Sequence, residues 1–201
     1  MEDRQPPRLH VELVRTPDTV TARAEAVAAA GWRTSTWEPC EQPIEFARQE
    51  GPCAGVVIGE GDGRPVPVAA EATTTVSLRR YPRPSQGSCS GEQTTGILLV
   101  LISPRDADAA QALRDWGDFI HLRHIAEAGV PGYRTIAAWE NEHLTGPRFC
   151  HLYEMTGDDP QATFERMTPL VRGRLDPSTF RSWAWHPQLV IEESRTYRRT
   201  S

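Results

Sequence analysis

The apolar run from Gly96 to Ser103, GILLVLIS, constrains what this chain can fold into more than any other segment. It is rich in Ile, Leu and Val, and its length is typical of a strand that is buried on both faces. Such a strand needs a packing layer on each side, made of helices or of a second sheet. The run therefore predicts a layered structure around a central strand in the second half of the chain.

The segments after this run alternate between helical and strand patterns. Gly129 is expected to end the first helix, and Asp159-Pro160 to cap the second. We predict helices over 107–128 and 161–171 and strands over 133–140, 148–155, 179–186 and 188–193. The resulting order, β-α-β-β-α-β, is that of a ferredoxin-like sheet and places the second half in the α+β class.

The most loop-like stretch of the chain is 81–95, YPRPSQGSCSGEQTT. We interpret it as a linker between an N-terminal α/β half, residues 1–80, and a ferredoxin-like domain, residues 96–201. The first half is expected to contain strands at 9–14, 32–38, 54–60 and 73–80 and an Ala-rich helix from Pro17 to Ala30. Its β-α-β opening repeats that of the second half, which indicates either a degenerate internal duplication or a chance similarity.

Composition excludes several classes of protein. The formal net charge of -5 argues against a nucleic-acid partner. No apolar run approaches the ~20 residues that cross a bilayer, and the N-terminus lacks a secretion signal. We therefore expect a cytoplasmic protein with no membrane partner. All 22 basic residues are Arg, so lysine Schiff-base chemistry and a Walker lysine are excluded.

No pattern for a cofactor or a metal stands out. The four cysteines are widely spaced, without a Cys-x-x-Cys pair, which does not favour a structural zinc site. The Gly-rich segment 59–63, GEGDG, is interpreted as a turn because no helix pattern follows it. We expect no organic cofactor and no metal site.

Several motifs of the second half resemble those of the dimeric α+β barrel superfamily. This superfamily includes EthD-like proteins, antibiotic-biosynthesis monooxygenases, muconolactone-type isomerases and small polyketide cyclases. The resemblance extends over about 96–175. It is carried by the following segments: Gly96–Val100, Asp115-Trp116 with His121 five residues later, Pro131-Gly132-Tyr133, Leu152–Met155 and Asp159-Pro160.

The resemblance implies two ferredoxin-like sheets that pack face to face. Most members achieve this as a homodimer, and here the first half of the chain is a second candidate for the partner sheet. Either arrangement gives a tandem or dimeric α+β barrel. The resemblance also implies a small-molecule substrate, bound in a cleft between the second sheet and its helices.

Histidine is the side chain best suited to proton transfer near neutral pH, and two histidines are candidates for that role. Strand alternation places Phe149, His151 and Tyr153 on one face, so these residues are expected to form a pocket wall. His121 occupies the motif position near the end of the predicted helix. We expect His151, on a rigid strand, to be the main base. A hydrogen-bonded core histidine and a half-exposed helix histidine are the structural alternatives.

Aromatic residues are the candidates for substrate binding. The next strand places Tyr133 and Trp139 on one face, and we expect this face to share a cavity with His151. Trp116 and His124 lie at helical spacing and are expected to point towards the same cavity. Simple core packing is the alternative for each aromatic residue.

These residues favour an enzyme that works by proton transfer without an organic cofactor. His151 or His121 would remove an acidic proton next to a carbonyl, and Tyr153 would hold the enolate oxygen. The reaction would be a cyclisation, isomerisation or dehydration of a polyketide-like or aromatic intermediate. The alternatives are a cofactor-independent monooxygenase of the same fold and a non-catalytic small-molecule binding protein.

Overall fold

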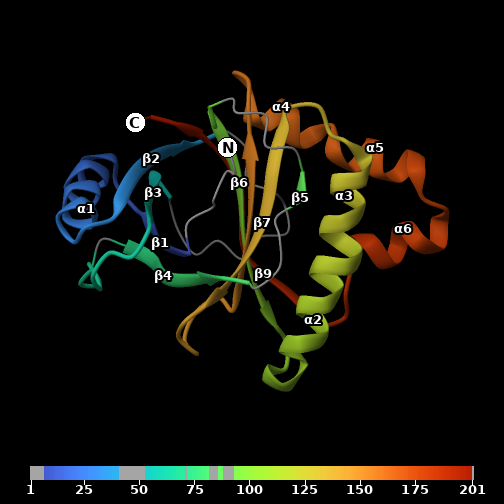
Figure 1. The fold of residues 1–201 in the computed structure, drawn as a ribbon, viewed down its shortest axis with the longest axis horizontal. Helices are drawn as coiled ribbons and strands as arrows, with labels where there is room; N and C mark the ends of the chain where they lie inside the picture. Colours follow the sequence, from blue (N-terminus) through green and yellow to red (C-terminus); the bar gives the residue numbers. More distant parts are fainter. Residues whose placement is uncertain (1–6, 41–52, 71, 82–85, 88–92, 201) are drawn as a thin grey trace.

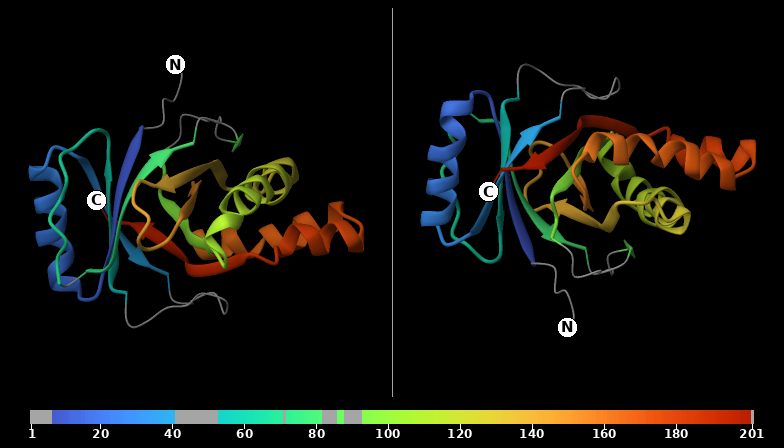
Figure 2. Two further views of the ribbon diagram at one scale, coloured as in Figure 1. Left: turned by 90° about the horizontal axis from the view of Figure 1, so that it is seen from below. Right: turned by 90° about the horizontal axis from the view of Figure 1, so that it is seen from above.

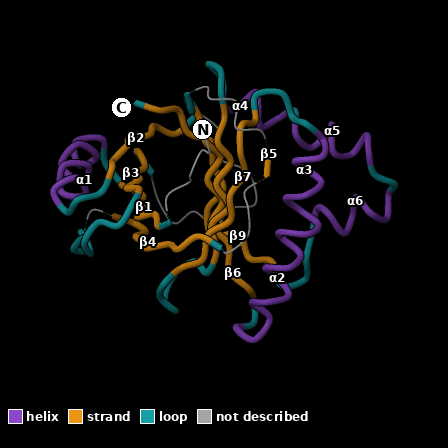
Figure 3. Tube along the Cα trace, viewed as in Figure 1, coloured by secondary structure: helices purple, strands orange, loops and turns teal. Residues whose placement is uncertain are grey.

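The computed structural model describes residues 7–40, 53–70, 72–81, 86–87 and 93–200. Its strands form a continuous antiparallel sheet in the order β4-β1-β3-β2-β9-β6-β8-β7-β5. A further pairing between β4 and β7 closes the eight longer strands into a barrel. Figures 1 and 3 show the strands as a middle layer with helices on both sides.

The first half of the chain supplies four strands and one helix. They are β1 (Arg8–Val14), α1 (Pro17–Ala29), β2 (Arg33–Pro39), β3 (Gly55–Glu60) and β4 (Ala72–Arg80). These bounds confirm the predicted elements to within one or two residues. The four strands lie in the order β4-β1-β3-β2, and α1 covers their outer face (Figure 2).

The second half supplies four long strands and most of the helices. They are β6 (Gly96–Pro104), α2 (Ala110–Trp116), α3 (Arg123–Ala128), β7 (Tyr133–Asn141), β8 (Phe149–Met155), α4 (Pro160–Glu165), α5 (Met167–Arg174), α6 (Pro177–Ala184) and β9 (Leu189–Arg199). A 3₁₀ turn, Ala107–Ala109, precedes α2, and a π-helical segment, Gly117–Leu122, joins α2 to α3. The predicted helix 107–128 is therefore confirmed in extent, and the strand order is β9-β6-β8-β7.

The predicted strand 179–186 is wrong, because this segment belongs to α6. The Asp176 side chain accepts hydrogen bonds from the backbone N–H groups of Ser178 and Thr179, and Pro177 occupies the first turn. Both features start helices. The last strand accordingly begins at Leu189. The predicted helix 161–171 is divided into α4 and α5.

The segment predicted to be a linker, 81–95, contributes to the folded structure where it is described. Tyr81 is buried, and β5 (Gln86–Gly87) pairs with β7. Residues 82–85 and 88–92 lie outside the described residues.

The barrel closes within one chain because the two halves pair at both of their junctions. Strand β2 pairs with β9, and β4 pairs with β7. The barrel interior is filled by apolar side chains from all eight long strands, including Leu13, Trp37, Leu78, Leu99, Trp139 and Cys150.

A second core lies between the outer face of the C-terminal sheet and the helices that cover it, and includes Leu98, Ile125, Tyr153, Val171 and Trp183. Figure 2 shows α2 and α3 on this face, opposite the side that α1 covers. Among the described helices, none combines the length and the hydropathy that a membrane span requires.

Candidate functional site

The two histidines predicted to act in catalysis come together beneath the π-helical segment. His151 lies on the helix-facing side of β8, where its Cα pairs with those of Val100 and Ala138. Gly117 packs directly over its imidazole, since a Cβ at this glycine would lie 3.1 Å from His151 Cε1 and 3.2 Å from Nε2. The absence of a side chain at Gly117 therefore lets the helix approach the histidine closely.

The π-helical turn determines where His121 is placed. Such turns are rare, occur mostly as single-turn insertions within α-helices, and are frequent at functional sites. Here the wider turn spans Gly117–Leu122, so His121 occupies its last part rather than a regular α-helical position. His121 is partly exposed, whereas His151 is only 3 % exposed.

Helix α6 fixes the tautomer of His121. The Nδ1 atom lies 3.0 Å from the carbonyl oxygen of Trp183. A carbonyl oxygen only accepts hydrogen bonds, so Nδ1 is the donor, and in the neutral ring Nε2 keeps the lone pair. The Trp183 indole N–H in turn donates to the carbonyl oxygen of His121 at 3.1 Å. These two hydrogen bonds hold the imidazole with Nε2 available to accept a proton.

The imidazole of His121 lies between two indole rings. Its centroid is 5.2 Å from that of Trp183, with the planes inclined by 9°, and 4.9 Å from that of Trp116. Trp116 is held by a hydrogen bond of 2.7 Å from its indole N–H to the Ser182 carbonyl oxygen. His186 also packs against Trp116, with 5.6 Å between the ring centroids. Side chains from α2, the π-helical segment and α6 thus form one group of contacting rings that includes His121.

Both imidazoles are neutral in the resting protein. Burial lowers the pKa of His151 to about 3, and the neighbouring His121 acts in the same direction. Burial also lowers the pKa of His121 to about 4, against the opposing effect of the hydrogen bond to Trp183. Each ring therefore has an unprotonated nitrogen at neutral pH. The imidazolium formed by protonating it would need a nearby anion to stabilise its charge.

Two tyrosines lie on the same side of the sheet as His151. The rings of Tyr133 and Tyr153 are 5.8 Å apart, and the Tyr133 hydroxyl donates to the sulfur of Met167 at 3.5 Å. Burial raises the pKa of both phenols well above the usual value. Both hydroxyls consequently stay protonated and are hydrogen-bond donors.

Trp139 is a correction to the predicted pocket, because it lies on the opposite face of the sheet. The pairing of β7 with β8 shifts register between Tyr133 and Thr135, as in a β-bulge. Such a shift reverses which side chains share a face. Tyr133 therefore packs with the helices, whereas Trp139 points into the barrel interior and has no part in the histidine site.

The remaining predicted residues have different surroundings. Phe149 packs with Trp116 in a third core cluster, on the same side of the sheet as His151. His124 lies 3.5 Å from the carboxylate of the exposed Glu127, and no contact described for it reaches the histidine pair. Sequence reasoning missed the roles of Gly117 and His186, although a glycine inside a helical pattern was a visible signal.

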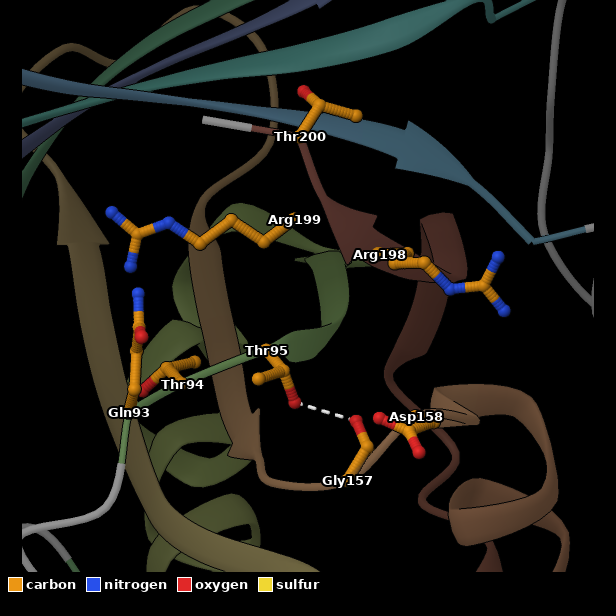
Figure 4. A pocket seen from close by; sticks show the side chains of 8 residues that line it. All are labelled: Gln93, Thr94, Thr95, Gly157, Asp158, Arg198, Arg199 and Thr200. Atoms are coloured by element: carbon orange, nitrogen blue, oxygen red, sulfur yellow. Dashed lines mark hydrogen bonds between the residues drawn. The ribbon is translucent and has the colours of Figure 1, made fainter.

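The structure also has an open polar cleft of about 520 Å³ at the end of β9 (Figure 4). Its lining residues are Gln93, Thr94, Thr95, Gly157, Asp158, Arg198, Arg199 and Thr200. The Thr95 hydroxyl donates to the Gly157 carbonyl oxygen at 2.6 Å. None of these residues belongs to the predicted site. Within the described residues, no group of three or more His, Cys, Asp or Glu side chains is placed to hold a metal ion.

No protein-family model matches this chain, and no curated protein matches its sequence. Solved structures do match its fold. An anthrone oxidase-like protein aligns with a TM-score of 0.56 at 10 % identity, over 100 % of this chain and 93 % of its own. A major regulator of staphylococcal pathogenesis aligns with a TM-score of 0.56 at 8 % identity, over 96 % and 99 % of the two chains.

A mutant chlorite dismutase from Candidatus Nitrospira defluvii aligns with a TM-score of 0.54 at 8 % identity, over 98 % of this chain and 93 % of its own. At these identities the likeness concerns the fold alone, since one fold carries many activities. The comparisons agree with the strand pairing: this chain has the architecture of an α+β barrel.

Proposed function

We propose that this protein is a small-molecule enzyme in which His121 removes a proton from an enolisable aromatic or polyketide-like substrate, without an organic cofactor. The observation that carries the proposal is the hydrogen bond from His121 Nδ1 to the Trp183 carbonyl oxygen. It leaves the Nε2 lone pair free on a partly exposed residue whose ring contacts two indole rings. A flat, partly apolar substrate suits these surroundings.

Proton transfer at this site forms an ion pair. The imidazolium of His121 is unstable in the resting protein, because burial lowers its pKa to about 4. An enolate beside it supplies the missing negative charge, so the base gains strength as the substrate loses its proton. Tyr153, whose raised pKa keeps its hydroxyl protonated, is the donor proposed for the enolate oxygen; because Tyr153 is only 2 % exposed, this role requires the side chains that cover it to move when the substrate binds. His151 stays neutral beside the base and does not oppose its protonation.

Sequence reasoning ranked His151 above His121 because a strand is the more rigid element. We now propose the reverse order. His121 has a defined tautomer and partial exposure, whereas His151 is almost fully buried against Gly117. A base must reach the proton that it removes, so the accessible histidine is the better candidate.

Oxygenation is the second candidate function, favoured by the likeness to an anthrone oxidase-like protein. The same proton abstraction would give an enolate that reduces dioxygen. A methylene group of the substrate would become a carbonyl, with one oxygen atom in the product and the other released as water. Both candidates need the His121 base, and oxygen consumption distinguishes them.

We also infer that each half of the barrel is a ferredoxin-like unit. The order β4-β1-β3-β2 of the first half has the same form as the order β9-β6-β8-β7 of the second. A helix follows the first strand in both halves. This similarity supports a tandem duplication in which the first half lacks the second helix over its described residues.

The test compares the wild type with histidine variants in the turnover of anthrones and of cyclic β-diketones. Product formation is followed by chromatography, and oxygen consumption with an oxygen electrode. His121→Ala should lower turnover by ~10²–10⁴-fold, which is the usual contribution of a general base. His151→Ala should have a smaller effect. The control is His143→Ala, in an exposed loop. Full activity of His121→Ala, with the fold intact by circular dichroism, would refute the proposed base.

A further inference from the structure

A cluster of three arginines surrounds one buried carboxylate where β4 meets β7. Glu140 is 5 % exposed. Its carboxylate lies 2.6 Å from Arg114 of α2 and 3.3 Å from Arg79 of β4, and it also pairs with Arg148, next to β8. The three guanidinium groups thus come from three different parts of the fold, at the junction between its two halves.

The cluster carries more positive than negative charge. Glu140 balances only one of the three guanidinium groups. Among the described residues, Asp118 is a second acidic group close to the cluster, since its charge helps to raise the pKa of Tyr81. Counting both carboxylates, one positive charge remains among these described groups. The Arg79 side chain is 62 % exposed and hydrated, whereas those of Arg114 and Arg148 are only 22 % and 26 % exposed, so an additional anion is favoured beside the latter two.

Aromatic rings support the guanidinium groups. The guanidinium carbon of Arg114 lies 4.6 Å from the ring centroid of Tyr81 and 5.6 Å from that of Phe149. That of Arg148 lies 5.7 Å from the Phe149 ring. The two aromatic rings themselves meet edge to face at 6.0 Å. Stacking of this kind restricts the guanidinium groups and leaves their N–H edges for polar partners.

Two buried donors in the cluster lack an acceptor in the part of the chain that the structure describes. They are the hydroxyl of Tyr81, which lies beside the guanidinium group of Arg114, and the Nε–H of Arg114. Tyr81 is 4 % exposed, and burial keeps its phenol protonated by raising its pKa. Leaving such a donor unsatisfied costs about 1–3 kcal/mol, so unpaired groups of this kind indicate an absent partner. The partner they require is a hydrogen-bond acceptor.

We propose that this cluster, formed by Arg79, Tyr81, Arg114, Glu140 and Arg148, binds the oxyanion of a small molecule, as a carboxylate or a phosphate. The Tyr81 hydroxyl and Arg114 Nε–H donate to the anion, and the surplus positive charge balances it. Guanidinium groups match the geometry of both kinds of oxyanion. The site is separate from the cleft at the end of β9 and does not depend on the proposed activity of His121.

The experiment measures binding of inorganic phosphate and of benzoate by isothermal titration calorimetry, at constant ionic strength with chloride as the background anion. The test variant is Tyr81→Phe, which removes only the unpaired hydroxyl. The matched control is Tyr133→Phe, at a partly buried tyrosine whose hydroxyl already has a partner in Met167. Thermal unfolding in chloride alone accompanies each titration.

The wild-type protein should bind at least one of the two anions with saturation, and the anion that binds identifies the oxyanion class. Tyr81→Phe should lower the affinity about tenfold or more, as expected for losing a hydrogen bond to a charged group. Without the anion, Tyr81→Phe should melt at an equal or higher temperature, because an unsatisfied hydroxyl has been removed. Absence of saturable binding to the wild type, or equal affinity in Tyr81→Phe, would overturn the proposal.

Discussion

The buried neutral state of His151 makes the stability of this protein depend on pH. Its pKa is about 3 in the folded protein, compared with an ordinary value of 6.5. The unfolded chain therefore binds more protons than the folded one as the pH falls below 6.5. The contribution of His151 to stability is complete above pH 6.5 and is lost progressively down to about pH 3. His121, with a pKa of about 4, acts in the same direction.

The size of the effect follows from these values. At pH 5 an unfolded histidine is almost fully protonated, whereas folded His151 is not, which destabilises the folded state by about 2 kcal/mol relative to pH 7.5. Since domains of this kind have a total stability of about 5–15 kcal/mol, the loss is measurable. We expect His151→Leu, which removes the titrating group, to narrow the difference in unfolding free energy between the two pH values by about 2 kcal/mol.

The assay is urea unfolding followed by circular dichroism at pH 7.5 and pH 5.0. His143→Ala is the matched control, because it removes an exposed histidine and leaves the buried pair unchanged. If His151→Leu leaves the difference in unfolding free energy between the two pH values as large as in the wild type, His151 is not held in a buried neutral form, and the proposed environment of the histidine pair is wrong.

Three further predictions concern packing, a buried ion pair and the absence of a chromophore. Gly96→Ala should destabilise the fold by about 1–3 kcal/mol in urea unfolding, because its Cβ would lie 2.3 Å from Pro160 Cγ. Glu12→Gln should cost about 3–5 kcal/mol in the same assay, because it leaves the charge of Arg23 without its fully buried partner. The purified protein should be colourless with less than one equivalent of zinc or iron, so a visible absorption band or a full metal equivalent would contradict the proposed cofactor-free chemistry.

Local sequence signals were sufficient for most of the elements. The apolar run that became β6 and the Ala-rich helix α1 were predicted within one or two residues, since periodicity and end signals are local properties. The failure at α6 has a physical cause. The segment 179–186 was predicted to be a strand, although Asp176 and Pro177 before it form a helix start. The capping side chain satisfies backbone donors there, which stabilises the helix over the strand.

For the candidate site, strand alternation correctly placed Phe149, His151 and Tyr153 on one face of β8. It failed for Trp139, because a register shift in β7 depends on pairing with a neighbouring strand and leaves no local pattern. The hydrogen bonds between His121 and Trp183 also could not be predicted from the sequence. These residues lie 62 positions apart, and they meet only because α6 folds back over the π-helical turn.

The sequence by itself determined most of the strands and helices and which face of β8 carries the histidine, because both depend on neighbours along the chain. The tertiary structure decided the closure of one barrel from both halves, the tautomer of His121 and the convergence of three arginines on Glu140. Each of these depends on groups brought together from distant segments. The chemistry of a site depends on burial and on partners, and these exist only after the chain has folded.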